Sequence, residues 1–141
     1  MKMSWLALAV VGLGAVGIAL YAADDKKGDK QMHVFELRTY YAAPGKMPAL
    51  HARFREHTCK LFEKHGMAIV GFWSPIDNSE AEQKLIYILS YPSKEAADRS
   101  WAAFRNDPLW KEVREVSEKN GKLVEKVESV YLNPTDYSPM K

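Results

Sequence analysis

The order of hydrophobic patterns along the chain constrains the fold more than any other sequence feature. Apolar residues alternate with a period of two in four segments, about 32–41, 67–73, 84–91 and 123–132. Helical periodicity fills the stretch after the first segment and the stretch before the last. The order strand, helix, strand, strand, helix, strand is that of a ferredoxin-like domain, whose antiparallel sheet carries its helices on one face. We therefore expect an α+β fold of βαββαβ order, in which the second and third strands form a hairpin.

The helical regions have clear start and stop signals. A periodic apolar face predicts a first helix from Met47, which Gly66 ends. Ser93 is a typical N-cap residue, and Asp107, followed by proline, predicts that a second helical segment is interrupted and restarts there. The restarted helix is expected to end near Gly121.

The first strand carries charged residues on one face. Glu36, Arg38 and Tyr40 alternate with Leu37 and Thr39, so the carboxylate and the guanidinium lie roughly 7 Å apart on the same side. They can neutralise each other or bind a polar ligand. The strands are apolar on both faces, so a sheet with one open face would expose a large apolar patch, which dimerisation would cover.

Any cavity in this fold is expected to be lined by aromatic and titratable side chains of the strands and helices. An apolar pocket with a few polar groups could be built from them. The same side chains could instead pack the core and a dimer interface. The candidate pocket residues are Glu36, Arg38, Tyr40, His51, His65, Trp73, Tyr87, Tyr91, Trp101 and Trp110.

Neither a metal site nor a nucleotide site is predicted. His51, His57 and His65 share the first helix, but none is four residues from another, and the outer two lie roughly 21 Å apart along the axis. Residues 12–17 match the dinucleotide fingerprint, but no strand precedes them. No cofactor is therefore predicted, and a single histidine as a haem ligand or proton shuttle remains an open alternative.

The N-terminal region predicts export. Lys2 precedes an uncharged, largely apolar run of nineteen residues, Trp5 to Ala23, which resembles a signal peptide cleaved after Ala22. The run approaches the roughly 20 residues that cross a bilayer, so an uncleaved membrane anchor is the alternative. In either case we expect a domain outside the cytoplasm, periplasmic or secreted.

Composition limits partners and cross-links. Without Lys2, the chain contains 19 basic and 18 acidic residues, and no basic cluster follows the linker. Nucleic acid is therefore not an expected partner. Cys59 is the only cysteine, so no internal disulfide can form. The expected organisation is an export or anchor segment over 1–23, a linker over 24–31, one domain over 32–132 and an extended tail over 133–141.

Several short motifs together resemble one known family, NIPSNAP, over nearly all of residues 32–132. They are Glu36-Leu37-Arg38-Thr39-Tyr40 with Pro44-Gly45-Lys46, Lys64-His65-Gly66, Val70-Gly71-Phe72-Trp73, Leu89-Ser90-Tyr91-Pro92-Ser93, Trp101, and Asp107-Pro108-Leu109-Trp110. The resemblance implies a dimeric α/β barrel, similar to monooxygenases of the antibiotic-biosynthesis type, some relatives of which oxidise aromatic substrates or bind haem. It implies no agreed catalytic motif.

The sequence therefore predicts an exported homodimer that acts as a binding module for a small apolar ligand or as a protein-interaction module. One alternative is a cofactor-independent monooxygenase-like enzyme, in which Arg38 polarises a substrate oxygen and a tyrosine or histidine moves a proton. Haem binding in the barrel cavity, through His51 or His65, is the other.

Overall fold

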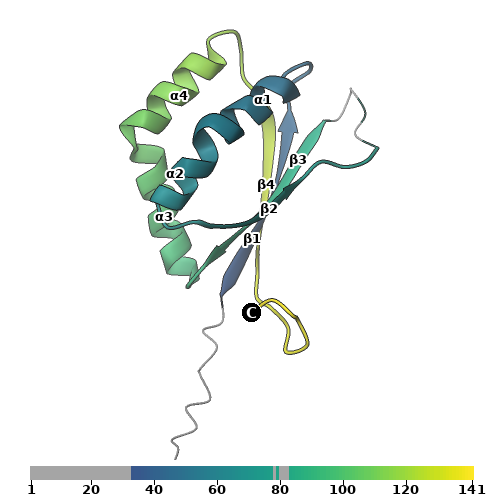
Figure 1. Ribbon diagram of the computed structural model, residues 1–141, viewed down its shortest axis with the longest axis vertical. Helices are drawn as coiled ribbons and strands as arrows, with labels where there is room; N and C mark the ends of the chain where they lie inside the picture. The colour runs from purple at the N-terminus through teal and green to yellow at the C-terminus, as the bar shows by residue number, and fades with distance from the viewer. Residues whose placement is uncertain (1–32, 78, 80–82) are drawn as a thin grey trace, which may run out of the picture.

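The computed structural model describes residues 33–77, 79 and 83–141. These residues form a four-stranded antiparallel sheet of order β2-β3-β1-β4, with the helices on one face (Figure 1). The elements are β1 (Val34–Ala42), α1 (Met47–Arg53), η1 (Phe54–Thr58), α2 (Cys59–Lys64), β2 (Ala68–Trp73), β3 (Lys84–Tyr91), α3 (Lys94–Asn106), α4 (Pro108–Glu118) and β4 (Val124–Leu132). This confirms the predicted α+β class and ferredoxin-like order. The predicted export segment and linker lie outside the described residues.

The predicted helix caps are present. The Ser93 hydroxyl accepts a hydrogen bond from the backbone N–H of Ala96 at 3.1 Å, which satisfies a free donor in the first turn of α3. The Asp107 carboxylate does the same for α4 by accepting from the N–H of Leu109 at 2.8 Å. Gly66 follows α2 with a positive φ of 75°, a conformation that glycine adopts without strain.

The first helical region is not the regular helix that the sequence predicts. The segments α1, η1 and α2 follow one another without a break, and η1 is a π-helical turn. The Thr58 hydroxyl donates to the backbone carbonyl of Arg53 at 3.2 Å, which gives that carbonyl a partner within the widened turn. One extra residue rotates everything after it by about 100°. His51 and His65, which regular spacing places on one face, therefore reach different parts of the molecule.

Strand register divides the sheet into two faces. The inner face, toward the helices, carries Glu36, Arg38 and Tyr40 of β1 and the buried side chains Leu85, Tyr87, Leu89 and Tyr91 of β3, as the alternation predicts. We call the opposite side the outer face, and its apolar residues are Phe35, Leu37, Trp73, Ile86, Ile88, Val130 and Leu132.

The alternation fails at the start of β4. A register shift after Tyr41 pairs Val124 with Ala42, so Val124 packs against the core, whereas strict alternation predicts it on the face of Lys126. A bulge inserts one extra residue into a strand. Because side chains alternate between the two faces, the residues before the bulge lie on the face opposite to the one that regular alternation predicts.

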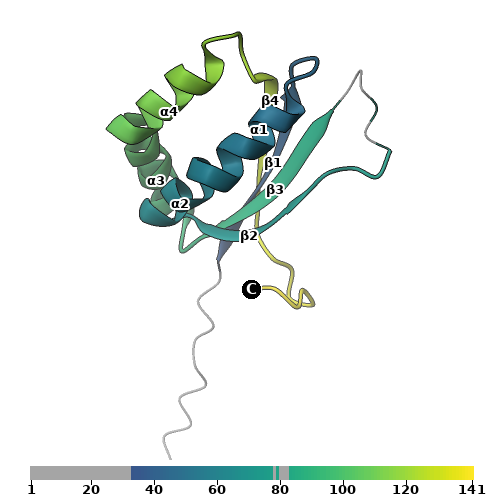
Figure 2. The same cartoon turned by 45° about the horizontal axis from the view of Figure 1, so that its top comes forward.

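Aromatic rings fill the space between the helices and the sheet. Phe62 of α2 is fully buried, and its ring centroid lies 5.8 Å from Tyr87, 5.5 Å from Trp101 and 5.1 Å from Phe104. Phe54 of η1 joins the same cluster from the side of β2. Figure 2 shows the helical layer standing over the inner face of the sheet. The core is therefore aromatic from the inner face of β3 to α3.

The C-terminal tail, residues 133–141, contains no helix or strand. The N–H of Ser138 donates to the carbonyl of Thr135 at 3.1 Å, and the Lys141 ammonium donates to carbonyls of Thr135 and Asp136. The prediction of an extended tail is wrong, because the tail folds back into a closed turn near the end of β4 (Figure 1). None of the helices in the described residues has the length and apolar character needed to cross a membrane.

Candidate functional site

A buried carboxylate lies at the centre of the predicted site. Glu36 is fully buried on the inner face of β1 and accepts four hydrogen bonds. One oxygen accepts from Arg38 Nη1 and from the Ser129 hydroxyl, each at 2.6 Å. The other accepts from the Tyr91 hydroxyl at 2.8 Å and from the Trp101 indole N–H at 2.6 Å. Both oxygens are therefore fully used by protein donors.

The electrostatics keep this carboxylate ionised. Burial alone would raise the pKa of Glu36, but the hydrogen bonds from Ser129, Trp101 and Arg38, with the charge of Arg38, outweigh it and hold the pKa below its ordinary value. Burial and the bond to Glu36 raise the pKa of Tyr91, so this tyrosine stays protonated as a donor. Because Glu36 is charged and saturated, it is a fixed counter-ion for Arg38 rather than an available general base.

Two donors in this cluster have no acceptor. The Arg38 guanidinium lies 4.2 Å from the centroid of the Trp101 ring and 5.6 Å from that of Tyr40. Its buried Nε has no hydrogen-bond partner among the described residues, and neither has the hydroxyl of the fully buried Tyr87. Burial, then the neighbouring Tyr40, raise the pKa of Tyr87 well above 10, so its hydroxyl stays protonated. Both groups could donate to the oxygen atom of a ligand.

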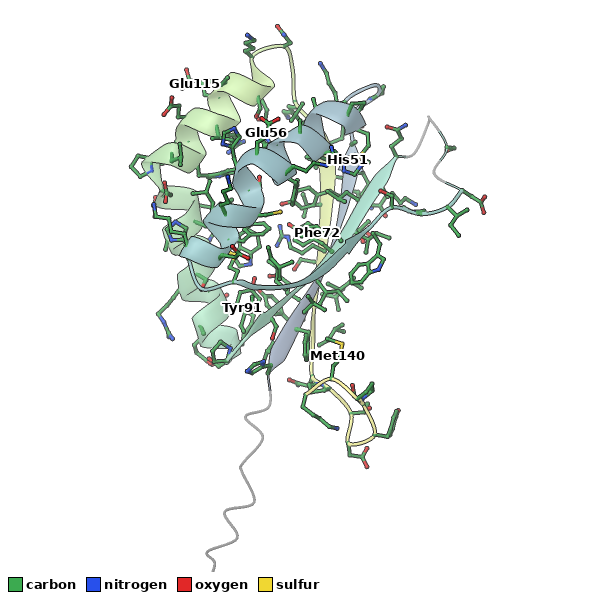
Figure 3. The ribbon with its side chains drawn as sticks, in the orientation of Figure 1. His51, Glu56, Phe72, Tyr91, Glu115 and Met140 are labelled. Atoms are coloured by element: carbon green, nitrogen blue, oxygen red, sulfur yellow. The ribbon has the colours of Figure 1, made fainter. Side chains whose placement is uncertain are left out.

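Two other predicted residues border a separate cavity of about 220 Å³ at the edge of the sheet. It lies between α1, η1 and β2, and Phe54, Phe72 and Leu85 give it an apolar lining, with His51 at one side. Burial, and then Arg55, lower the pKa of His51, which favours the neutral imidazole. Figure 3 shows His51 and Phe72 on facing elements. The cavity volume of about 220 Å³ is below the roughly 300–1,000 Å³ of typical ligand pockets, so the cavity suits only a small molecule.

Trp73 connects this cavity to the outer face of the sheet. The side chain is 49% exposed, and the cavity touches the residue. Its ring also lies over Gly71, where an added Cβ would come within 2.8 Å of the indole. The indole can take this position because residue 71, at the bulge in β2, has no side chain.

His65 and Trp110 lie away from both places. His65 Nε2 lies 2.7 Å from the Asp107 carboxylate, which also accepts from Lys64 Nζ at 2.7 Å. Hydrogen bonds from Lys64 and His65 lower the pKa of Asp107, so it is ionised. Trp110 stacks on Phe104 with ring centroids 4.4 Å apart. These two predicted residues belong to a junction between α2, α3 and α4.

The structure thus divides the ten predicted residues into three groups. Six join the buried cluster around Glu36, two border the small cavity and two belong to the helix junction. Haem does not fit this arrangement, because His65 lies at the helix junction and does not border the cavity beside His51, and that cavity is too small. Sequence reasoning missed Ser129, Phe54 and Phe72, which only strand register and helix packing bring to the sites.

The comparisons with known proteins agree with this geometry. The NIPSNAP family model matches residues 35–139. The chain belongs to the NIPSNAP family. The predicted resemblance is thereby confirmed, and the matched range extends into the C-terminal tail. No curated protein sequence matches the chain.

Solved structures similar to this NIPSNAP chain establish its fold. A NIPSNAP family protein of unknown function from Agrobacterium tumefaciens aligns with a TM-score of 0.67 at 21% identity, covering 79% of this chain and 96% of that one. An uncharacterised NIPSNAP-like protein from Burkholderia xenovorans gives 0.66 at 17% identity over 77% and 90%. A Streptomyces coelicolor monooxygenase, solved with nanaomycin D, gives 0.51 at 14% identity over 80% and 96%. NIPSNAP proteins and such monooxygenases therefore share one architecture with this chain.

Proposed function

We propose that this NIPSNAP protein works as a homodimer that binds a small, largely apolar ligand, and that the two copies meet through the outer face of the sheet. The observation that carries the proposal is the uncovered apolar surface of that face. Val130 is 52% exposed there beside its cross-strand neighbour Leu37, and Leu132 and Trp73 are also exposed. No helix in the described part of the chain covers this side of the sheet (Figure 2).

The outer face has the composition of a protein interface. The apolar residues Leu37, Ile86 and Ile88 lie on the two central strands, β1 and β3. One end of this face is polar, because the Tyr41 hydroxyl donates to Glu128 there at 2.9 Å. An apolar centre with a polar rim is typical of such surfaces. A second copy supports the proposal best because the same patch on both subunits can pair across a two-fold axis.

The ligand site of the proposal is the cavity beside His51. Trp73 borders it and also lies on the outer face, so a second copy packed there would cover this tryptophan and the cavity edge next to it. Apolar side chains form the larger part of the lining, and its polar members are His51, Cys59, Ser74 and, at the exposed side, Arg55. Burial, then Arg55, favour the neutral form of His51, and burial, then Glu63, raise the pKa of the Cys59 thiol. A small, largely apolar molecule fits this lining, and any polar group that it carries can lie toward Arg55 and Ser74.

Val130→Lys should convert the dimer into a monomer. The substitution puts one lysine from each subunit into the apolar interface, and unpaired or like charges there cost several kcal/mol, so we expect dimerisation at least about 100-fold weaker. Native mass spectrometry of the protein purified from an exporting host measures subunit number and any retained molecule together.

The matched control is Val116→Lys, because Val116 is 60% exposed but lies on α4, in the helical layer. It should remain a dimer. A wild-type protein that is a monomer at micromolar concentration would disprove the dimer, and a dimer that retains no molecule and takes up no apolar probe would disprove the ligand.

We also propose that the chain is exported, on the pattern of residues 1–23 alone. The intact mass of the protein from the exporting host tests this. Loss of the mass of residues 1–22 is expected, whereas the full-length mass in the membrane fraction would indicate an anchor, and the full-length mass in the cytosol would contradict export.

A second candidate function, a cofactor-independent oxygenase, is favoured by one observation. The Nε of Arg38 and the hydroxyl of Tyr87 are buried donors without acceptors among the described residues, and together they could stabilise negative charge on a substrate oxygen. In that case Tyr87→Phe should abolish oxygen uptake with a polycyclic phenol as substrate.

Whichever function holds, Tyr87→Phe should raise the free energy of unfolding by about 1–3 kcal/mol, since it removes a buried hydroxyl with no hydrogen-bond partner among the described residues. Under the binding-module proposal it should not change oxygen uptake. Urea denaturation measures the change in stability, with Tyr91→Phe as the control. That variant removes a hydroxyl that does have a partner, Glu36, and should destabilise.

A further inference from the structure

A groove on the helical side of the molecule belongs to neither site described above. It has a volume of about 350 Å³ and runs between α1 and η1 on one wall and α4 on the other. The groove is larger than the cavity beside His51, which has about 220 Å³. The helices that form the groove lie on the side of the sheet opposite to the outer face (Figure 2). A dimer formed through the outer face would therefore leave the groove open.

The walls of the groove are apolar. Leu109, Val113 and Val116 recur on α4 at steps of four and three and form one stripe. Val113 is buried, but Leu109 is 47% exposed and Val116 is 60% exposed, so only the middle of the stripe is covered. Ala49 and Ala52 face it from α1, and their short side chains leave the space between the helices unfilled.

The floor of the groove is a buried arginine whose charge is already neutralised. Arg53 Nη1 donates to Glu118 at 3.0 Å and to the Ser117 hydroxyl at 3.3 Å, and the guanidinium lies 5.2 Å from the centroid of the Trp110 ring. Its Nε is buried and has no acceptor among the described residues. The floor therefore offers a ligand one free hydrogen-bond donor, Arg53 Nε, but no net positive charge that would attract an anion.

The rim of the groove is acidic. Glu56 and Glu112 line it from opposite helices, and neither forms an ion pair with a lysine or arginine of the described chain. Among the described residues, the side chain within ion-pair distance of Glu56 is His57, whose Nε2 lies 3.8 Å from the carboxylate. Glu56 and His57 belong to the π-helical turn, a feature that is frequent at functional sites. Figure 3 shows Glu56 at the groove, whereas Glu115 lies on the outward side of α4.

We propose that this groove binds a basic amphipathic helix of a partner protein. The apolar side chains of that helix pack between Ala49, Ala52 and the stripe of α4, and its flanking lysines or arginines lie against Glu56 and Glu112. Charge complementarity selects this partner. A fatty acid or another anionic ligand would be repelled by the carboxylates of Glu56 and Glu112. Arg53 would not compensate for this repulsion, because Glu118 already neutralises its charge.

A fluorescein-labelled, 14-residue leucine/lysine helical peptide tests the proposal by fluorescence anisotropy with the full chain. We expect saturable binding that weakens with salt, and no binding of the leucine/glutamate peptide of the same pattern. Glu112→Lys should weaken binding at least fivefold, and Glu115→Lys, the same charge change one turn along the same helix, should alter it less than twofold.

Two further variants separate groove binding from general charge attraction and from misfolding. Glu56→Gln, on the opposite wall, should weaken binding about twofold without a change in circular dichroism. Val130→Lys, on the outer face, should leave peptide binding unchanged even if it dissociates the dimer. Equal effects of Glu112→Lys and Glu115→Lys, or no saturable binding by the wild type, would overturn the proposal.

Discussion

Glu36→Gln should lower the free energy of unfolding by about 3–5 kcal/mol, because it leaves the Arg38 guanidinium without its counter-ion in a largely buried position. The amide has nearly the shape of the carboxylate, so the loss comes from charge and hydrogen bonding rather than from a cavity. Each oxygen of the carboxylate accepts two hydrogen bonds, whereas the amide of glutamine replaces one oxygen by an NH₂ group, which can only donate. That NH₂ group would face two other donors, either Arg38 and Ser129 or Tyr91 and Trp101. Urea denaturation at pH 7 measures the change.

The control for this prediction is Glu125→Gln. Glu125 is exposed on β4, and the described structure shows no hydrogen bond or ion pair from its side chain. Its substitution should change the free energy of unfolding by no more than about 0.5 kcal/mol. If Glu36→Gln behaves like this control, the buried cluster does not hold the fold together.

The same variant predicts a pH dependence. The pKa of Glu36 in the folded state lies below its ordinary value of 4.5, so the unfolded chain binds the proton more readily. The stability that Glu36 contributes is therefore fully present above about pH 4.5 and is lost as the pH falls from there toward the folded-state pKa. The difference in stability between wild type and Glu36→Gln should shrink in that acidic window. A difference that stays constant from pH 7 to pH 3 would contradict the lowered pKa.

The sheet and the helix caps could be predicted because their causes are local. A period of two places Leu85 and Tyr87 on one face whatever they contact, and Ser93 caps a helix through a bond to a residue only three positions later. The buried face of β1 follows from the same rule. Neutralisation of Arg38 by Glu36 is one of the two arrangements that this spacing predicts, and it is the one that the structure shows.

The parts that could not be predicted depend on the insertion of single residues or on distant pairing. The π-helical turn contains no glycine or proline that would mark it, and the bulge at the start of β4 carries no signal that distinguishes it from a regular strand. Ser129 reaches Glu36 only because β4 pairs with β1 in one register, across 93 residues of sequence. The groove between α1 and α4 likewise depends on how the two helices pack.

Phe62→Ala should also lower the free energy of unfolding by about 3–5 kcal/mol, the range for removing a large buried aromatic side chain. Phe62 is almost completely buried, and its ring contacts Phe54, Tyr87, Trp101 and Phe104. Phe62→Leu keeps most of the volume and should cost less than about 1.5 kcal/mol. A smaller loss for alanine than for leucine would mean that this cluster is not the packed centre of the core.

The alanine variant also tests where a ligand can bind. Aromatic rings fill the space between helices and sheet, so an apolar ligand can enter that space only if a ring moves away. Removing the Phe62 ring should leave a dry apolar cavity, and benzene bound there should raise the melting temperature of Phe62→Ala but not that of Phe62→Leu. If benzene stabilises neither variant, the core has collapsed around the lost ring. An apolar ligand would then find no room in the core, and the proposed ligand site remains the cavity beside His51, at the edge that the proposed dimer covers.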